Sequence, residues 1–458
     1  MIRARLVVAA ALGLFAWPLL THATVHEYVL DNGMKVLVKV DRRAPIVVSQ
    51  VWYKVGSSYE HNGITGVSHV LEHMMFKGTR KLKPGEFSEI IAANGGRENA
   101  FTGRDYTAYF QQLEKSRLPI ALELEADRMR NLTLPPEEFT RELGVVIEER
   151  RLRTEDQPRS LTYEQFNATA WTSSPYKQPI IGWMNDLENL KVEDLRPWYE
   201  KWYAPNNATL VVVGDVEPEA VHDLANRYFG PLPGSPVAAL KPRREAPQRG
   251  VRRVSVRVPA ELPYVLMGYK VPVLGTAEVE WEPYALEMVT GILSGGNSAR
   301  LPRELVRGQQ LAASAEAGYN LYARQDELFL IDATPASGHD VQKVEQAIRA
   351  QIERLKSELV SAQELDRIKA QVVAASVYEK DSAFYQAMEL GQLATVGLGW
   401  RRAEEYVERV RSVTAEQVQA VVNKYFVDEG LTVAQLEPLS LESRAAGTQQ
   451  QAGPALAP

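Results

Sequence analysis

The sequence predicts an α+β fold made of two similar halves, each an antiparallel sheet packed with helices. Strand-like runs and long helical patterns follow one another in an order typical of helices packed on a mostly antiparallel sheet. The segment KWYAPNNATLVVVGDVEP at 201–218 is echoed by KYFVDEGLTVAQLEP at 424–438, with a helix end, a turn and an apolar strand in both. Residues 230–250, rich in Pro, Gly and charge, are typical of a linker between the copies. Together these observations indicate an internal duplication.

Each element of the first half has its own local signal. Strands are expected over 25–30 and 34–40, because Asp31-Asn32-Gly33 between these apolar runs is typical of a hairpin turn. A second hairpin is expected over 98–113, with its turn at 103–105. The remaining predicted elements are strands over 45–55 and 207–216 and helices over 66–76, 119–132, 135–153 and 192–203.

These signals divide the chain into domains. We predict an N-terminal α+β domain over 24–232, a linker over 233–250 and a C-terminal domain of the same fold over 251–440. No histidine lies between His222 and His339, so the second domain cannot repeat a histidine cluster of the first at the matching place. The low-complexity tail, 441–458, is expected to be disordered.

Residues 1–23 have the layout of a secretory signal peptide. Arg3 and Arg5 precede an apolar run from Leu6 to Leu20, and small residues follow it. An uncleaved membrane anchor is the alternative, but this run is short for a membrane span, and no later stretch is long and apolar enough to be one. We therefore expect a periplasmic protein whose mature chain has no transmembrane segment.

Composition excludes several classes of function. The net charge of −6 argues against nucleic acid as a partner, since nucleic-acid-binding surfaces are usually basic. The chain has no cysteine, so it has neither a cysteine nucleophile nor a thiolate metal site. Any metal must be held by His, Asp or Glu.

The segment GVSHVLEHMMF, 66–76, places ligand-type side chains in an otherwise apolar run. On a helix advancing about 100° per residue, the apolar side chains share one face and His69, Glu72 and His73 share the opposite one. Two imidazoles four residues apart can share one ion, and neutral imidazole suits Zn²⁺. Glu72 is placed to take a proton from a metal-bound water, and HVLEH matches the inverzincin signature.

A catalytic zinc site needs a third protein ligand. Glu142 and Glu149 are seven residues apart, so on a helix both lie on the same face. Apolar residues between them indicate that this helix packs on the core, where a carboxylate needs a partner. Glu148 points about 100° away from Glu149 and competes with it for the role.

The sequence resembles the pitrilysin/insulinase zinc metallopeptidases, and within them the processing-peptidase-like members, over essentially the whole mature chain. GVSHVLEHMMFKGT at 66–79 matches the family's zinc helix almost residue for residue. The resemblance implies Glu149 as third ligand of one Zn²⁺ per chain and Glu142 as the group orienting a histidine. It also implies that Asn99 and Ala100, in GGRENAFTGRDYTAY, line a bound peptide. The fold it implies is a clamshell of two α+β halves around a chamber.

The sequence departs from this family at one place. Active members carry, in a second-type half, an Arg followed seven residues later by a Tyr, and the pair helps to hold substrate. Aligned on Arg-Leu at 300–301, these positions are Val306 and Ala313. A misalignment by a loop would let Tyr319 or Tyr322 replace the tyrosine.

The function implied is a zinc metalloendopeptidase that hydrolyses peptides or small unfolded proteins. Because the Arg/Tyr pair is missing, we expect this chain to be the zinc-bearing subunit of a heteromer whose paralogous partner supplies the pair. Homodimerisation is the simpler alternative, but two copies would still lack the pair. Maturation of a single peptide is equally compatible with the sequence. The alternative of another class is a non-catalytic scaffold subunit of a larger complex.

Overall fold

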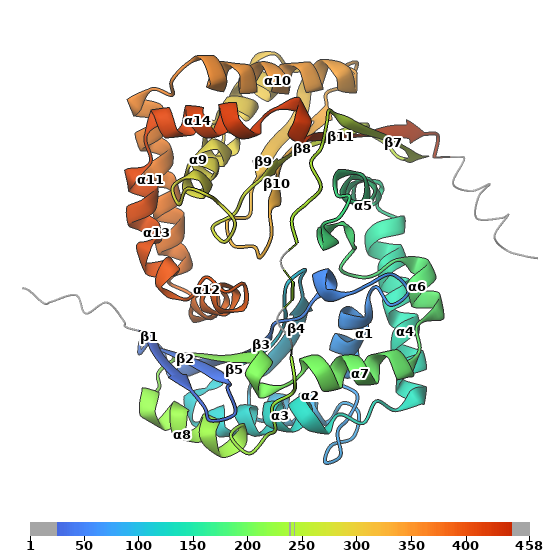
Figure 1. The fold of residues 1–458 in the computed structure, drawn as a ribbon, viewed down its shortest axis with the longest axis vertical. Coiled ribbons are helices and arrows are strands. Elements are labelled where there is room, and N and C mark those ends of the chain that lie inside the picture. The colour runs from blue at the N-terminus through green and yellow to red at the C-terminus, as the bar shows by residue number, and fades with distance from the viewer. Residues whose placement is uncertain (1–24, 238–239, 242, 442–458) are drawn as a thin grey trace, which may run out of the picture.

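The computed structural model describes residues 25–237, 240–241 and 243–441. The expected signal peptide, 1–23, and residues 442–458 of the expected tail lie outside the described residues. Two helix-backed sheets face each other, and the segment joining the halves runs between them (Figure 1). Among the described residues, no helix combines the length and apolar character needed to cross a membrane.

The first sheet contains both hairpins expected from the sequence. Its strand order is β1-β2-β6-β3-β5-β4, and every neighbouring pair is antiparallel except β2 and β6. Gly33 lies in the first hairpin turn with φ of +87°, a conformation that glycine adopts without strain. The strands are β1 (Val25–Val29), β2 (Lys35–Val40), β3 (Ile46–Tyr53), β4 (Arg97–Thr102), β5 (Thr107–Glu114) and β6 (Ala208–Gly214).

Helices of the first half pack on the sheet and on one another around a shared core. The predicted helix over 135–153 is α-helical only to Arg150 and continues as a π-helical turn, Arg151–Glu155. The helices are α1 (Val67–Met74), α2 (Glu86–Ala93), α3 (Leu118–Asn131), α4 (Pro136–Arg150), α5 (Pro158–Ala170), α6 (Met184–Asn189), α7 (Val192–Trp202) and α8 (Pro218–Tyr228).

The second half repeats the first, as the sequence echo predicts. Its sheet order, β7-β11-β8-β10-β9, reproduces β2-β6-β3-β5-β4, and its parallel pair, β7 with β11, occupies the same place. Its strands are β7 (Arg252–Pro259), β8 (Tyr264–Val271), β9 (Ala312–Gly318), β10 (Glu327–Pro335) and β11 (Leu431–Leu439). Its helices are α9 (Glu282–Ser294), α10 (Val341–Ser357), α11 (Ala362–Glu379), α12 (Ala383–Thr395), α13 (Arg401–Ser412) and α14 (Ala415–Tyr425).

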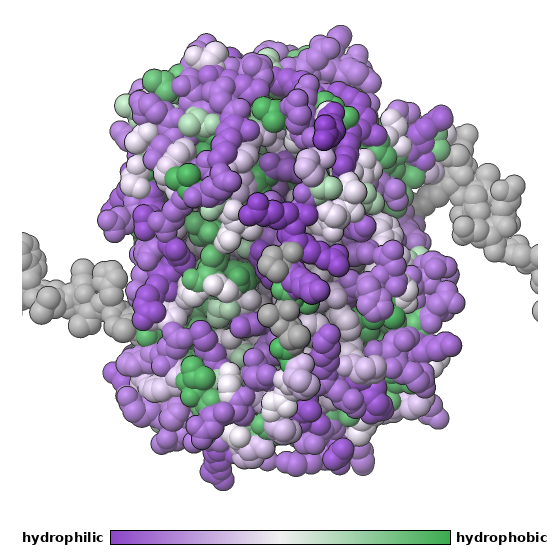
Figure 2. Space-filling model, in the orientation of Figure 1, coloured by the Kyte–Doolittle hydropathy of each residue, from purple (hydrophilic) through white to green (hydrophobic). Residues whose placement is uncertain are grey.

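One helix of each half packs on the sheet of the other half (Figure 1). Helix α12 packs on β3 and β6, and Gly391 lets it approach so closely that a Cβ there would lie 2.1 Å from the Trp52 ring. Helix α5 packs on β7 and β11, and its Phe166 lies over Gly268 of β8. Hydrophobic side chains are visible in the recess beside α12 on an otherwise mainly hydrophilic surface (Figure 2). This exchange holds the two halves together through apolar contact.

Candidate metal centre

A buried carboxylate fixes the start of helix α1, which carries the predicted histidines. Glu60 accepts hydrogen bonds from the backbone N–H groups of Gly66 (2.7 Å) and Ser68 (2.9 Å), which lie at the N-terminus of α1 and have no partner within the helix. Burial raises the pKa of Glu60 to about 7, although these donors favour the charged form. The apolar face of α1 is fully buried, so its polar face is fixed toward the space between the halves.

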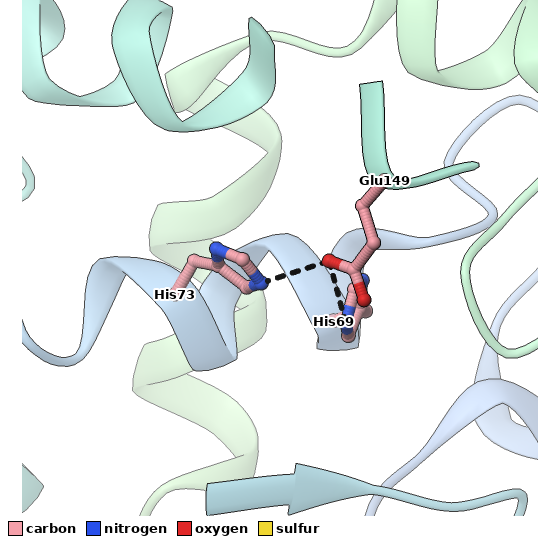
Figure 3. A group of neighbouring side chains, drawn as sticks. All are labelled: His69, His73 and Glu149. Carbon is pink, nitrogen blue, oxygen red and sulfur yellow. Dashed lines mark ion pairs between the residues drawn. The ribbon is translucent and has the colours of Figure 1, made fainter. Parts of the chain in front are cut away.

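His69, His73 and Glu149 converge on one point (Figure 3). Glu149 Oε2 lies 3.5 Å from His73 Nε2 and 3.9 Å from His69 Nε2. One potential ligand atom from each of the three residues lies within 4.8 Å of the others. Two imidazoles and a carboxylate are a donor set that catalytic zinc takes, with a fourth position left open. The structure therefore brings together the three residues expected from the sequence, in a geometry that fits zinc.

Burial favours the neutral, metal-binding form of His69, while Glu142 and Glu149 flank the ring of His73. Burial, and then repulsion from His73, lower the pKa of His69 to about 3. Nδ1 of His73 lies 3.2 Å from Glu142 Oε2, and Lys77 Nζ lies 2.7 Å from the other Glu142 oxygen. With a proton on Nδ1 shared with Glu142, Nε2 of His73 keeps its lone pair directed toward Glu149. The structure thus places Glu142 beside His73.

Glu72 lies on the same face of α1 and is partly buried. Thr102 at the end of β4 donates a hydrogen bond from Oγ1 to Glu72 Oε2 (2.5 Å). Burial raises the pKa of Glu72, while the hydrogen bond from Thr102 and the nearby His73 oppose that shift. A carboxylate with a raised pKa is better able to accept and release a proton near neutral pH.

These side chains line a cavity of about 810 Å³ to which both halves contribute. Asn99 and Ala100 line it from β4, which is the outermost strand of its sheet and has one edge that no strand of the described residues pairs with. Tyr322 and Glu327 reach it from the second half. The cavity therefore combines the candidate metal ligands, an open strand edge and walls from both halves.

Some residues of the site carry no sequence signal. Thr102 is the last residue of β4, and the hairpin pattern does not reveal what its hydroxyl contacts. Arg153 lies in the π-helical turn and forms an i,i+4 ion pair with Glu149 (2.6 Å). Glu148 is 63% exposed and pairs with Arg151, so it points away from the cavity.

The positions of the missing Arg/Tyr pair do not border this cavity. Val306 packs against the core of the second half, and Ala313 is exposed on β9. Of the two alternative tyrosines, Tyr322 lines the cavity. Tyr319 instead donates its hydroxyl proton to the Pro272 carbonyl oxygen (2.5 Å). An arginine and a tyrosine at positions 306 and 313 would thus lie away from His69 and His73 of the same chain.

The fold and this arrangement of side chains agree with the insulinase family of peptidases. Residues 35–183 match the family described as Insulinase (Peptidase family M16), and residues 189–372 match the Peptidase M16 inactive domain. The chain belongs to this family of zinc peptidases, as its similarity to individual proteins also shows.

Both the sequence comparison and the structure comparison find a similar protease in Helicobacter pylori. The zinc protease PqqE is 33% identical over 422 residues, which cover 90% of this chain and 93% of that protein. A crystal structure of a protease from the same species has a TM-score of 0.86 at 31% identity, covering 91% of this chain and all of that one. The periplasmic protease PqqL from Escherichia coli shares the fold, with a TM-score of 0.76 at 19% identity. The match covers 94% of this chain but 50% of PqqL.

Proposed function

We propose that this chain is a zinc-dependent endopeptidase in which His69, His73 and Glu149 hold one Zn²⁺. The proposal rests on one observation: these three donors converge in the same cavity as the partly buried carboxylate of Glu72. Relatives that are named zinc proteases support the choice of metal and of reaction.

In the proposed mechanism the chain's own residues move the proton and orient the substrate. Zinc, when bound, would polarise the scissile carbonyl and lower the pKa of a nearby water. Glu72 would accept a proton from the water that bonds to the carbonyl carbon and pass it to the amine nitrogen as the C–N bond breaks, while Thr102 holds the carboxylate in place. Glu142 keeps the His73 ring in the orientation that directs Nε2 toward the metal.

The substrate is proposed to be an extended peptide. The free edge of β4 offers backbone donors and acceptors beside Glu72, and Asn99 and Ala100 line that part of the cavity. A peptide that adds as a further strand is held mainly through its main chain, so selection depends on shape and extension more than on one side chain.

We further propose that a paralogous partner completes the enzyme. The aligned positions Val306 and Ala313 lack the arginine and tyrosine and lie away from the cavity, so a pair at these positions would act on another subunit's site. The chain spans half the length of PqqL, which supports pairing of two such units. A periplasmic location is part of the proposal, and it is supported by the signal peptide predicted from the sequence.

The test is to purify the protein from its native host and assay each component alone and mixed. Wild type should carry one zinc per chain, cleave unstructured peptides poorly alone and gain activity with its partner. Glu72→Gln should keep the zinc and lose roughly 10²- to 10⁴-fold in kcat, because only the proton acceptor is removed. Stoichiometric zinc with unchanged cleavage by Glu72→Gln would refute the assigned base. A wild type without stoichiometric zinc would indicate a scaffold subunit.

A further inference from the structure

The tips of two equivalent hairpins, one from each half, meet beside the candidate metal centre. The turn between β4 and β5 contains Arg104 and Asp105, and the loop between β9 and β10 contains Arg324 and leads into Glu327. The sheet orders show that β4–β5 and β9–β10 are corresponding hairpins. The halves therefore touch at equivalent points, and both contribute charged residues there.

One ion pair joins Arg104 of the first half to Glu327 of the second. Nη1 of Arg104 lies 3.0 Å from Oε1 and 3.1 Å from Oε2 of Glu327. The second nitrogen, Nη2, donates to Tyr163 Oη (3.1 Å) and Asn167 Oδ1 (3.3 Å) on α5. The side chains are 19% and 10% exposed, so the pair is largely shielded from water.

The other ion pair runs in the opposite direction, from Arg324 of the second half to Asp105 of the first. Nε of Arg324 lies 3.0 Å from Asp105 Oδ1, and the Arg324 backbone N–H also donates to this carboxylate (3.2 Å). Asp105 is 5% exposed and accepts further hydrogen bonds from Ser58 Oγ (2.7 Å) and the Tyr176 hydroxyl. Each half thus supplies one arginine and one carboxylate.

These charges are not needed to hold the halves together, because α5 and α12 already bury apolar side chains across the interface. Burying ion pairs costs desolvation that their attraction often fails to offset, so such pairs are weak evidence for added stability. What they can add is a unique position for the groups that carry them. Here those groups include the turn that follows Thr102 directly.

We propose that these two reciprocal ion pairs fix the tip of the β4–β5 hairpin and thereby position Thr102, which holds Glu72, and the peptide-binding edge of β4. The inference rests on the proposed function for its effect on catalysis. Arg324 does not line the metal cavity, so it acts as a positioning residue through the hairpin. The second half, which lacks the histidine motif, contributes in this way to the site of the first.

The test compares Arg324→Met with wild type by amide hydrogen exchange and by kinetics on the complex from the native host. Amides of residues 97–113 should exchange roughly ten-fold faster in the variant, because the tip loses its tether. The kcat for peptide cleavage should fall roughly ten- to a hundred-fold, with zinc content unchanged and KM within about three-fold. Arg324→Lys, which keeps the charge, should recover part of both losses.

Arg300→Met is the matched control. Arg300 forms a similarly buried two-point pair with Glu364 (3.1 and 2.8 Å), entirely within the second half. It should lower thermal stability without changing exchange over 97–113 or kcat. If Arg324→Met fails to fold, Glu327→Gln probes the same tether from the other pair.

Unchanged exchange over 97–113 in a folded variant would overturn the inference, and so would an equal loss of kcat in the control. Faster exchange with full kcat would overturn the link to Glu72. If wild type cleaves no peptide, the proposed function fails, while the exchange result still decides whether the ion pairs fix the hairpin.

Discussion

Glu149→Gln gives the sharpest test of the proposed ligand set, because it changes one ligand's charge and almost none of its shape. The substitution also removes the ion pair with Arg153, but Arg153 is 75% exposed and such pairs contribute little to stability. Removing a residue that only hydrogen-bonds to a metal ligand weakens metal binding by up to about 100-fold. Loss of a direct ligand should therefore weaken zinc binding by at least about 100-fold.

The expected rise in Tm on adding zinc follows from the stabilisation that a ligand gives when it binds only the native state. At free zinc about 100 times the wild-type Kd, binding stabilises the native state by about 2.7 kcal/mol, and a 100-fold weaker variant keeps only about 0.4 kcal/mol. With an unfolding entropy of about 2.1 cal/mol/K per residue, the wild-type gain raises Tm by about 3 °C if the whole chain unfolds together, and by about 6 °C if the first half unfolds alone.

The assay is thermal unfolding of chelator-treated protein with and without added zinc, alongside direct zinc titration. Glu148→Gln is the matched control, since it makes the same change one residue away on a carboxylate that is 63% exposed and faces away from the cavity. Wild type and Glu148→Gln should show the full zinc-dependent rise in Tm. A full zinc-dependent rise in Tm for Glu149→Gln, or loss of that rise in Glu148→Gln, would refute the assignment of Glu149 as a zinc ligand.

Two further predictions concern the frame around the site. Gly391→Ala should lower the free energy of unfolding by about 1–3 kcal/mol, because its Cβ would meet Trp52. Gly144→Ala, in open space on α4, should raise it by up to about 1 kcal/mol. Urea unfolding measures both changes, and equal effects of the two substitutions would contradict the packing argument. Because burial raises the Glu60 pKa from 4.5 to about 7, the folded state binds a proton that the unfolded state releases, so stability falls as pH rises from about 4.5 to 7. The fall contributed by this group amounts to about 3 kcal/mol. Glu60→Gln should show a shallower decline in urea midpoint across this range, and identical slopes would count against the assignment.

Local patterns predicted the parts of this molecule that depend on neighbours in sequence. The turn at Asn32-Gly33, the hairpin over 98–113 and the helix carrying His69 and His73 each follow from spacing and turn chemistry. The duplication followed from one echo of helix end and strand, and the matching sheet orders confirm it.

Long-range contacts could not be predicted in the same way. The apolar face of α12 shows that it must be buried, but not that it packs on the first sheet rather than on its own. The hydrogen bond from Thr102 to Glu72 and the ion pairs at the hairpin tips join residues far apart in sequence, so no periodicity reports them. The resemblance supplied the spacing that selects Glu149, and the structure adds that Glu148 faces away.

A crystal structure of the protein with zinc, with anomalous maps on both sides of the zinc edge, tests the central claim most directly. Tetrahedral bonds of about 2.0–2.1 Å place donor atoms about 3.3–3.4 Å apart, so the 3.9 Å between His69 Nε2 and Glu149 Oε2 should contract by about half an ångström around the ion. We expect one anomalous peak bonded to His69, His73 and Glu149. No peak there at saturating zinc, or a peak bonded to other side chains, would contradict the account.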